Sequence, residues 1–263
     1  MPPHPHILAV DIGNTSTTLG LYRAGKVSRV TTVPGGFPGR EEIEAALRGM
    51  VKGRVIQQSM ISSVVPRKNV RWRRAIKKVV GVDPAYLTYQ TPLPIGIDFP
   101  KPETIGADRL ANACGAAARY GRPIIVVDIG TAMTFDIVSK KRGYIGGIIA
   151  PGLPLMFDYM AEKTALLPHS QPAKLRRSIG RSTEEAMRIG AQLGYRGMVR
   201  EMLVDVKKEM NERGVKVCAT GGYAKWVMKE IDPGIPVERD LTLFGLGIIC
   251  EYSAGTEVSP PRI

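Results

Sequence analysis

The stretch ILAVDIGNTSTTLGLY, from Ile7 to Tyr22, is repeated in outline by IIVVDIGTAMTFDIV, from Ile124 to Val138. Each copy is an apolar run of strand length that ends in aspartate, isoleucine and glycine, followed by hydroxyl side chains. A single copy could be a strand that merely ends in a turn. Two copies, each leading into a second strand-like run, indicate a duplicated domain.

The elements that follow each copy also keep the same order. In each half we expect three antiparallel strands, then alternating helices and strands. The expected strands lie at residues 7–12, 17–23 and 27–33 in the first half, and at residues 123–128, 133–138 and 144–150 in the second. A segment rich in proline and glycine separates the halves. We therefore predict an N-terminal lobe at residues 1–105 and a C-terminal lobe at residues 106–263.

Aspartate, glycine and hydroxyl side chains at a strand end suit a phosphate-binding turn. Gly13 and Gly130 have no Cβ, so backbone N–H groups there can approach a phosphate closely. Asp11 and Asp128 would repel a phosphate unless a cation lies between them, and Mg²⁺ takes one or two carboxylates together with phosphate oxygens. The two loops are therefore predicted to hold a nucleoside triphosphate and its metal from two sides.

This duplicated pattern resembles the superfamily of actin, hexokinase and acetate kinase. The resemblance implies an α/β fold of two actin-like (ribonuclease H-like) lobes, each with a mixed sheet flanked by helices, and an ATP cleft between them. The Walker sequence GxxxxGK[ST] does not occur in the chain, which excludes a P-loop.

A second distinctive stretch, GADR at residues 106–109, begins an alanine-rich segment with a helical pattern that runs to Tyr120. Asp108 and Arg109 would lie in the first turn, where the helix dipole favours an acid and free N–H groups can bind an anion. Asp108 could accept the proton of an alcohol while Arg109 holds an anionic group, which suits phosphoryl transfer to a hydroxyl. A first-turn acid with a surface arginine beside it is the alternative interpretation.

Seven motifs occur in order along nearly the whole chain: DIGNT, GADRLANA, DIGTAMTFD, YIGGIIAPG, KTALLP, STEEAM and TGGYA. Together they resemble the type III pantothenate kinase family. The resemblance implies ATP-dependent phosphorylation of the 4′-hydroxyl of pantothenate, the first step of coenzyme A biosynthesis. It also implies Mg²⁺ and a monovalent cation, K⁺ or NH₄⁺, as cofactors, and a homodimer with the acceptor site at the subunit interface.

The same resemblance assigns roles to individual residues. Asp108 would be the catalytic base, Asp128 would hold the monovalent cation, and Asp11 would act on Mg²⁺ indirectly. The implied ATP-binding residues are Asp11, Ile12, Gly13, Asn14, Thr15, Ser16, Thr17, Thr18 and Thr131. The implied pantothenate-binding residues are Phe99, Gly106, Ala107, Asp108, Arg109 and Thr183.

Four positions depart from the usual pattern of the family. Phe99 stands where tyrosine is usual, so one hydroxyl contact to pantothenate is lost, although the ring can still pack against the substrate. Ser16 and Ser182 replace asparagines, and Phe244 stands where a glutamate is more usual. None of the positions implied in catalysis is missing.

The chain carries a formal net charge of +13, which favours anionic partners. Its densest run, RKNVRWRRAIKK at residues 67–78, has seven positive charges. Val70, Arg73 and Ile76 recur at helical spacing, which predicts an amphipathic helix with a basic, solvated outer face. Nucleic acid is not expected as a partner, because Trp72 is the only aromatic residue near this run.

Two alternative functions stay open on the sequence alone. One is another small-molecule kinase of the same superfamily, and the other is a non-catalytic regulatory or nucleic-acid-associated accessory factor of the same fold. Neither an apolar run of membrane-spanning length nor a signal-peptide pattern occurs, so a cytoplasmic location is expected. Cys114, Cys218 and Cys250 are too scattered for a disulfide framework or a metal site.

Overall fold

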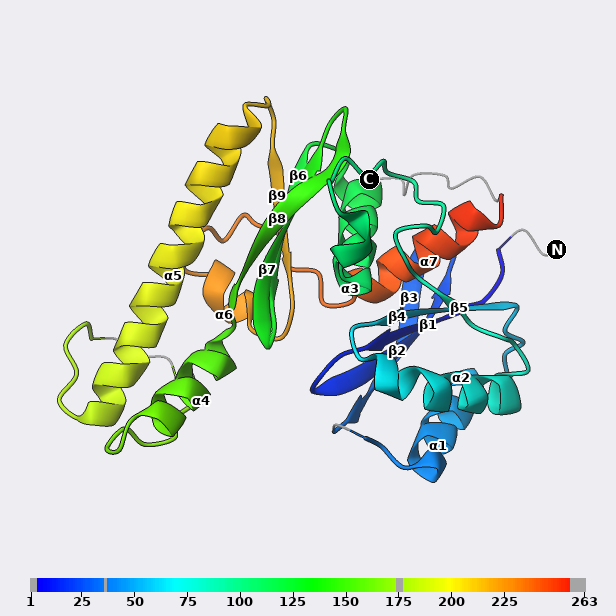
Figure 1. Cartoon of the computed structure of the whole chain (residues 1–263), viewed down its shortest axis with the longest axis horizontal. Coiled ribbons are helices and arrows are strands. Elements are labelled where there is room, and N and C mark those ends of the chain that lie inside the picture. The colour runs from blue at the N-terminus through cyan, green and yellow to red at the C-terminus, as the bar shows by residue number, and fades with distance from the viewer. Residues whose placement is uncertain (1–3, 36, 174–176, 256–263) are drawn as a thin grey trace. The chain divides into compact units, whose positions relative to one another are not determined.

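The computed structural model describes residues 4–35, 37–173 and 177–255, and its packing divides the chain into two units (Figure 1). The first unit holds the residues up to Gly121, the short segment Arg142–Ile145, and the residues from Asp240 onward. The second holds Arg122–Lys141 and Gly146–Arg239. The first unit therefore extends beyond the predicted boundary at residue 105, and the chain passes between the units four times.

A five-stranded sheet in the order β3-β2-β1-β4-β5 forms the centre of the first unit. Its strands are β1 (Ile7–Ile12), β2 (Ser16–Arg23), β3 (Lys26–Pro34), β4 (Gln58–Ser63) and β5 (Ala85–Tyr86). β1 pairs antiparallel with β2 and parallel with β4, and β2 and β3 form an antiparallel hairpin. The three N-terminal strands confirm the predicted antiparallel arrangement within one residue at each end.

Helices cover both faces of this sheet (Figure 1). One face carries α1 (Arg40–Val51) and α2 (Pro66–Val80), and the other carries α3 (Ala107–Tyr120) and α7 (Leu241–Ser253), with the short 3-10 helix η1 (Pro102–Thr104) before α3. Leu8, Val10 and Ile12 alternate along β1 and join the core beneath α1 and α2. The alternate residues Ile7 and Ala9 are buried as well. Both faces of β1 are therefore covered, which explains why the strand is apolar up to Asp11.

The packing of α3 on α7 explains why the first unit extends past residue 105. The two helices approach so closely that a Cβ on Gly245 would lie 1.9 Å from the carbonyl oxygen of Ala111. A Cβ on Gly247 would similarly meet the ring of Tyr22 on β2 at 2.1 Å. Glycine at both positions lets α7 lie against the helix and the sheet together.

The second unit repeats the arrangement of the first. Its sheet has the order β8-β7-β6-β9, which matches β3-β2-β1-β4, and again the first strand pairs antiparallel with the second and parallel with the fourth. The strands are β6 (Ile124–Ile129), β7 (Ala132–Ser139), β8 (Gly143–Pro151) and β9 (Lys216–Thr220), and the first residues of β8, up to Ile145, pack with the first unit. The helices are α4 (Leu153–Lys163), α5 (Thr183–Met210) and α6 (Ala224–Met228). The predicted α/β duplication is confirmed.

The basic helix α2 forms where expected, but its inner face differs from the prediction. Val70 is 58% exposed, whereas Trp72, Ala75 and Ile76 are buried. Lys68 is also buried, although it belongs to the basic run. Of the residues at the predicted spacing, Ile76 lies in the core but Val70 does not, so the inner face is centred on Trp72 and Ile76. No helix in the described part of the chain is long and apolar enough to cross a membrane.

Candidate active site

The first predicted phosphate loop joins β1 to β2 through a tight turn. Asp11 lies near the end of β1, with Thr18 on β2 and Ser62 on β4 as its neighbours in the sheet. The backbone N–H of Gly13 donates to the carbonyl oxygen of Ser16 over 3.0 Å. A Cβ on Gly13 would lie 3.1 Å from that same oxygen, so the turn leaves little room for a side chain. Asn14 and Thr15 are exposed at its tip.

Lys68, a residue not singled out in the sequence analysis, contacts the backbone of this loop. Its side chain reaches the loop from α2 and is buried, with 3% of the residue exposed. The Nζ group donates to the carbonyl oxygens of Gly13, at 2.8 Å, and Asn14, at 3.3 Å. Burial lowers the pKa of Lys68, and the charge of Arg67 adds to this effect. Nothing in the sequence marks Lys68 among its basic neighbours.

The predicted acceptor segment begins α3, as expected from the sequence. Gly106 is the residue before the helix, and the carboxylate of Asp108 accepts a hydrogen bond from the backbone N–H of Arg109 over 2.8 Å. A Cβ on Gly106 would lie 2.5 Å from Oδ1 of Asp108. Any other residue at position 106 would therefore displace this carboxylate. Burial raises the pKa of Asp108, while the N–H and the charge of Arg109 oppose the rise. A raised pKa makes this carboxylate a better proton acceptor than an ordinary aspartate.

Tyr144 links Phe99 to Arg109 of the acceptor segment, because its ring contacts both side chains. Tyr144 received no role in the sequence analysis. The ring of Tyr144, at the start of β8, packs edge-on against Phe99 with 6.2 Å between ring centroids. The guanidinium of Arg109 lies 5.9 Å from the centre of the same Tyr144 ring. Tyr144 is held there by backbone hydrogen bonds with Gly96 and Asp98. Phe99 and Arg109 thus form one cluster in the first unit with Tyr144, which comes from a more distant part of the sequence.

The second predicted phosphate loop joins β6 to β7 in the second unit. Asp128 on β6 has Thr134 and Thr220 as its neighbours in the sheet, which repeats the hydroxyl neighbours of Asp11. The N–H of Gly130 donates to the carbonyl oxygen of Ala132 over 3.0 Å, and Thr131 is exposed at the turn. In both loops the glycine N–H closes the turn onto a backbone carbonyl, but the second turn is one residue shorter than the first.

Gly221, in the TGGYA motif after β9, borders the carboxylate of Asp128. Its φ of +95° is one that side chains rarely adopt, and a Cβ there would lie 2.5 Å from Oδ1 of Asp128. The negative charge of Asp128 also reaches Tyr195 on α5, whose pKa is raised first by burial and then by this charge. The structure thus brings Asp128 together with two residues to which the sequence assigned no role.

Thr183 begins α5 in the second unit. Ser182 caps this helix by accepting a hydrogen bond from the N–H of Glu185 over 3.2 Å, and Thr183 itself is exposed. The predicted pantothenate-binding residues are therefore divided, because Phe99 and Gly106–Arg109 belong to the first unit and Thr183 to the second.

Metal binding by protein side chains alone has little support among the residues described. No group of three or more histidine, cysteine, aspartate or glutamate side chains in that part of the chain could hold a metal ion. Asp11 and Asp128 are single carboxylates at loop ends. This arrangement fits Mg²⁺ that takes its other ligands from phosphate oxygens and water. At Asp128 the adjoining backbone carbonyl of Ile129 offers a second oxygen donor.

Comparison with known proteins decides the family. The sequence profile described as type III pantothenate kinase matches residues 7–205. The chain belongs to this family. A type III pantothenate kinase from Methylacidiphilum infernorum is 38% identical over 247 residues, which cover 93% of this chain and 88% of the relative. One from Akkermansia muciniphila is 44% identical over 80% of this chain and 85% of the relative.

Type III pantothenate kinases are phosphotransferases with ATP as the donor, and the predicted enzyme class is confirmed. Solved structures of low sequence identity support the fold alone. A protein from Campylobacter jejuni, titled a putative Baf family transcriptional activator, aligns with a TM-score of 0.60 at 19% identity, covering 94% of this chain and 99% of that one. A ROK hexokinase from Thermus thermophilus aligns with a TM-score of 0.50 at 12% identity, covering 93% and 98%.

Proposed function

We propose that this protein transfers the γ-phosphoryl group of ATP to the 4′-hydroxyl of pantothenate, with Asp108 as the base. The observation that carries this assignment is the half-buried Asp108 carboxylate, which Gly106 leaves room for and whose pKa burial raises. A base with a pKa closer to neutrality accepts the hydroxyl proton more effectively than an ordinary aspartate.

In the proposed reaction the 4′-oxygen forms a bond to the γ-phosphorus while the bond to the β-phosphate oxygen breaks. ADP leaves, and the proton of the hydroxyl passes to Asp108. Arg109 holds the carboxylate of pantothenate, and its position beside the ring of Tyr144 limits where the guanidinium can lie. Phe99 packs beside the same ring and would form an apolar wall for the acceptor.

Residues of both sheets are proposed to hold ATP. In the first unit, the N–H groups and hydroxyls of Asp11–Thr18 would contact phosphate oxygens, and Lys68 would fix the loop and add a positive charge beneath it. In the second unit, Thr131 would contact ATP and Asp128 would hold K⁺ or NH₄⁺ with the carbonyl of Ile129. Mg²⁺, when bound near Asp11, would neutralise the charge of the phosphates during transfer.

A homodimer is proposed on the basis of apolar side chains that the second unit leaves exposed. Tyr159 on α4 is 64% exposed, and Leu166 and Ile179 in the segment before α5 are 91% and 82% exposed. Thr183 follows this segment, so a partner that covers it would also adjoin the proposed acceptor contact. Light scattering should give twice the chain mass, and replacement of Tyr159 and Leu166 by serine should shift the equilibrium toward monomer.

A steady-state assay tests the proposed reaction. ADP formation is followed with ATP, Mg²⁺ and K⁺, with and without pantothenate, and the product is identified by mass spectrometry. ADP release that depends on pantothenate, together with 4′-phosphopantothenate as product, would support the proposal. ADP release that does not respond to pantothenate, or that responds instead to a sugar, would contradict it.

A further inference from the structure

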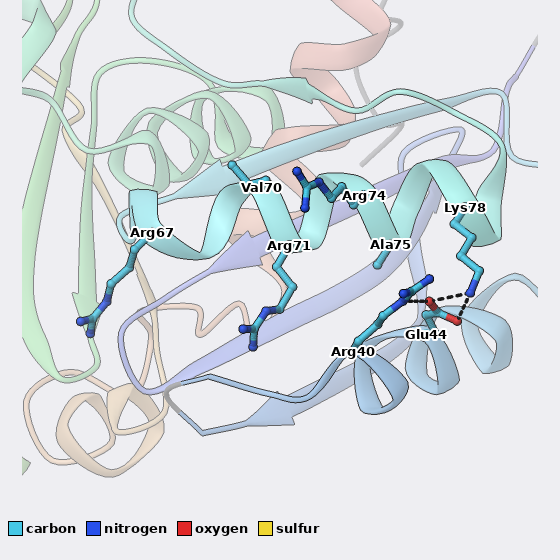
Figure 2. A pocket seen from close by; sticks show the side chains of 8 residues that line it. All are labelled: Arg40, Glu44, Arg67, Val70, Arg71, Arg74, Ala75 and Lys78. Atoms are coloured by element: carbon cyan, nitrogen blue, oxygen red, sulfur yellow. Dashed lines mark hydrogen bonds and ion pairs between the residues drawn. The ribbon is translucent and has the colours of Figure 1, made fainter.

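A basic hollow opens between α1 and α2 on the first unit (Figure 2). It has a volume of about 420 Å³, and its charged lining consists of Arg40, Glu44, Arg67, Arg71, Arg74 and Lys78. None of these residues belongs to the predicted ATP or pantothenate contacts. Five cations and one carboxylate leave a formal excess of four positive charges.

Helical spacing places four of these cations in one row. Arg67, Arg71, Arg74 and Lys78 recur at intervals of three and four residues, so they share one side of α2. At about 1.5 Å per residue the row is roughly 16 Å long. The opposite side of the helix carries Trp72 and Ile76 into the core, which fixes the orientation of the row.

One end of the hollow is closed by an ion pair between the two helices and a second ion pair within α1. Lys78 on α2 and Arg40 on α1 converge on the carboxylate of Glu44, at 2.9 and 2.8 Å (Figure 2). These partners lower the pKa of Glu44 to about 2, with the hydrogen bond from Lys78 as the largest cause. Glu44 therefore stays ionised at neutral pH and holds α1 and α2 together at this end.

At the other end, few of the hydrogen-bond donors of Arg67, Arg71 and Arg74 are used by the residues that the structure describes. The guanidinium of Arg67 lies over the ring of Phe37 at 4.5 Å, and Arg71 donates one hydrogen bond to the carbonyl oxygen of Pro38 over 2.8 Å. Both side chains are thereby positioned, and Figure 2 shows them extending in the same direction from α2. Arg74 forms no hydrogen bond or ion pair with any residue that the structure describes.

We propose that this hollow binds a small molecule with two or three consecutive phosphate groups. Planar guanidinium groups bind phosphate oxygens in pairs, and each phosphate brings between one and two negative charges, so a diphosphate or triphosphate would offset the excess charge. The volume lies in the range of small-molecule sites. A nucleic acid fits less well, because none of the described lining residues is aromatic and the neighbouring ring of Phe37 is already covered by the guanidinium of Arg67.

Calorimetry with inorganic triphosphate tests the proposal on the full chain. Triphosphate can also enter the phosphate loops of the active site, so the titration is fitted with two sites. We expect the second site to hold one triphosphate per chain, and we expect Arg71→Gln/Arg74→Gln to weaken binding at that site on the order of tenfold or more, because two charge-assisted phosphate contacts are lost at the hollow. A parallel titration with ADP distinguishes a nucleotide diphosphate from a free inorganic ligand, and a second bound equivalent of either would support the site.

The matched control is Arg73→Gln/Lys77→Gln, which removes the same charge from the side of α2 where both residues pair with Asp83. This variant should bind triphosphate as the unaltered protein does. The proposal is overturned if no second triphosphate binds, or if both double variants lose affinity at the second site equally, since a general effect of charge would then suffice. If a twelve-nucleotide oligothymidylate binds to the same arginines more tightly than triphosphate and in a salt-sensitive way, the hollow is a nucleic-acid-binding surface and the proposal is wrong.

Discussion

The ammonium group of Lys68 lies 2.8 Å from the carbonyl oxygen of Gly13, in the turn that is proposed to bind the phosphates of ATP. A buried ammonium is costly unless its donors are satisfied, and Lys68 finds two backbone carbonyls rather than a carboxylate. Its charge is therefore not cancelled by a neighbouring acid among these contacts. An anion bound on the other side of the turn would benefit from that charge.

Replacement of Lys68 should affect ATP more than pantothenate. Hydrogen bonds to charged groups contribute about 1.5–3 kcal/mol, so Lys68→Met should raise KM for ATP roughly ten- to hundredfold. Methionine keeps most of the buried apolar part of the lysine side chain but removes its charge. KM for pantothenate should change little. Lys77→Met, on the exposed side of the same helix, serves as the control. An equal change of KM for ATP in both variants would show that Lys68 has no specific role in nucleotide binding.

Asp108→Asn and Asp11→Asn should fail in different ways. The first keeps the shape of the side chain but removes the base, so turnover should fall about 10²–10⁴-fold while pantothenate still binds. The second removes a carboxylate beside the metal and should weaken productive binding of Mg·ATP. Steady-state kinetics with each substrate varied in turn separates the two effects. Near-normal turnover of Asp108→Asn would show that another group accepts the proton.

Gly106→Ala should disable the protein without unfolding it. The new Cβ would lie 2.5 Å from Oδ1 of Asp108, so the carboxylate must leave its position, and turnover should fall at least about tenfold. Gly49→Ala is the matched control, because Gly49 lies within α1 and a Cβ there meets nothing within 4 Å. That variant should keep full activity and gain a little stability. Unimpaired turnover of Gly106→Ala would refute the close contact.

The raised pKa of Asp108 has a defined effect on pH dependence. The base must be ionised, so activity is present above its pKa in the folded protein and is lost as the pH falls through that value. The acidic limb of kcat/KM should therefore lie above about 3.9, the ordinary value for aspartate. The folded state also favours the protonated carboxyl, so Asp108→Asn should melt at a higher temperature than the unaltered protein at pH 7. A lower melting temperature at that pH would contradict the direction of the shift.

Activation by a monovalent cation should depend on Gly221. A side chain at this position would meet Oδ1 of Asp128 at 2.5 Å and would strain the backbone. Gly221→Ala should therefore lose the difference in rate between potassium and sodium buffers. Gly222→Ala, where a Cβ meets nothing within 4 Å, should retain it. Equal rates of the unaltered protein in the two buffers would count against a cation at Asp128.

Local sequence pattern predicted the elements well, because strands and helices depend on alternation and spacing. The alanine-rich run gave α3 with both ends correct, from Ala107 to Tyr120. The repeated aspartate and glycine gave two loops that each close on the glycine N–H, although the second turn is one residue shorter. The extent of the first unit could not be predicted in this way, because it depends on the contact of Ala111 with Gly245, far apart in the chain.

The residues that were missed act through long-range contacts or against their usual preference. Lysine is normally solvated, so the burial of Lys68 within a basic run had no local signal. The spacing of Val70 and Ile76 suggested one inner face, but the large Trp72 determined which side of α2 turns inward. Tyr144 follows a turn and gains its role only by packing beside Phe99 and Arg109.

The place of α7 in the first unit has a consequence for how the protein is made. The first sheet is formed by residues near the N-terminus, but one of its faces is covered by a helix that begins at Leu241. On the ribosome the chain emerges from the N-terminus, so this face of β1 and β2 lacks the cover of α7 until residues 241–253 have been synthesised. The second unit has no such requirement, since all its residues lie between Arg122 and Arg239. The half that is translated first is therefore the half that can finish folding last.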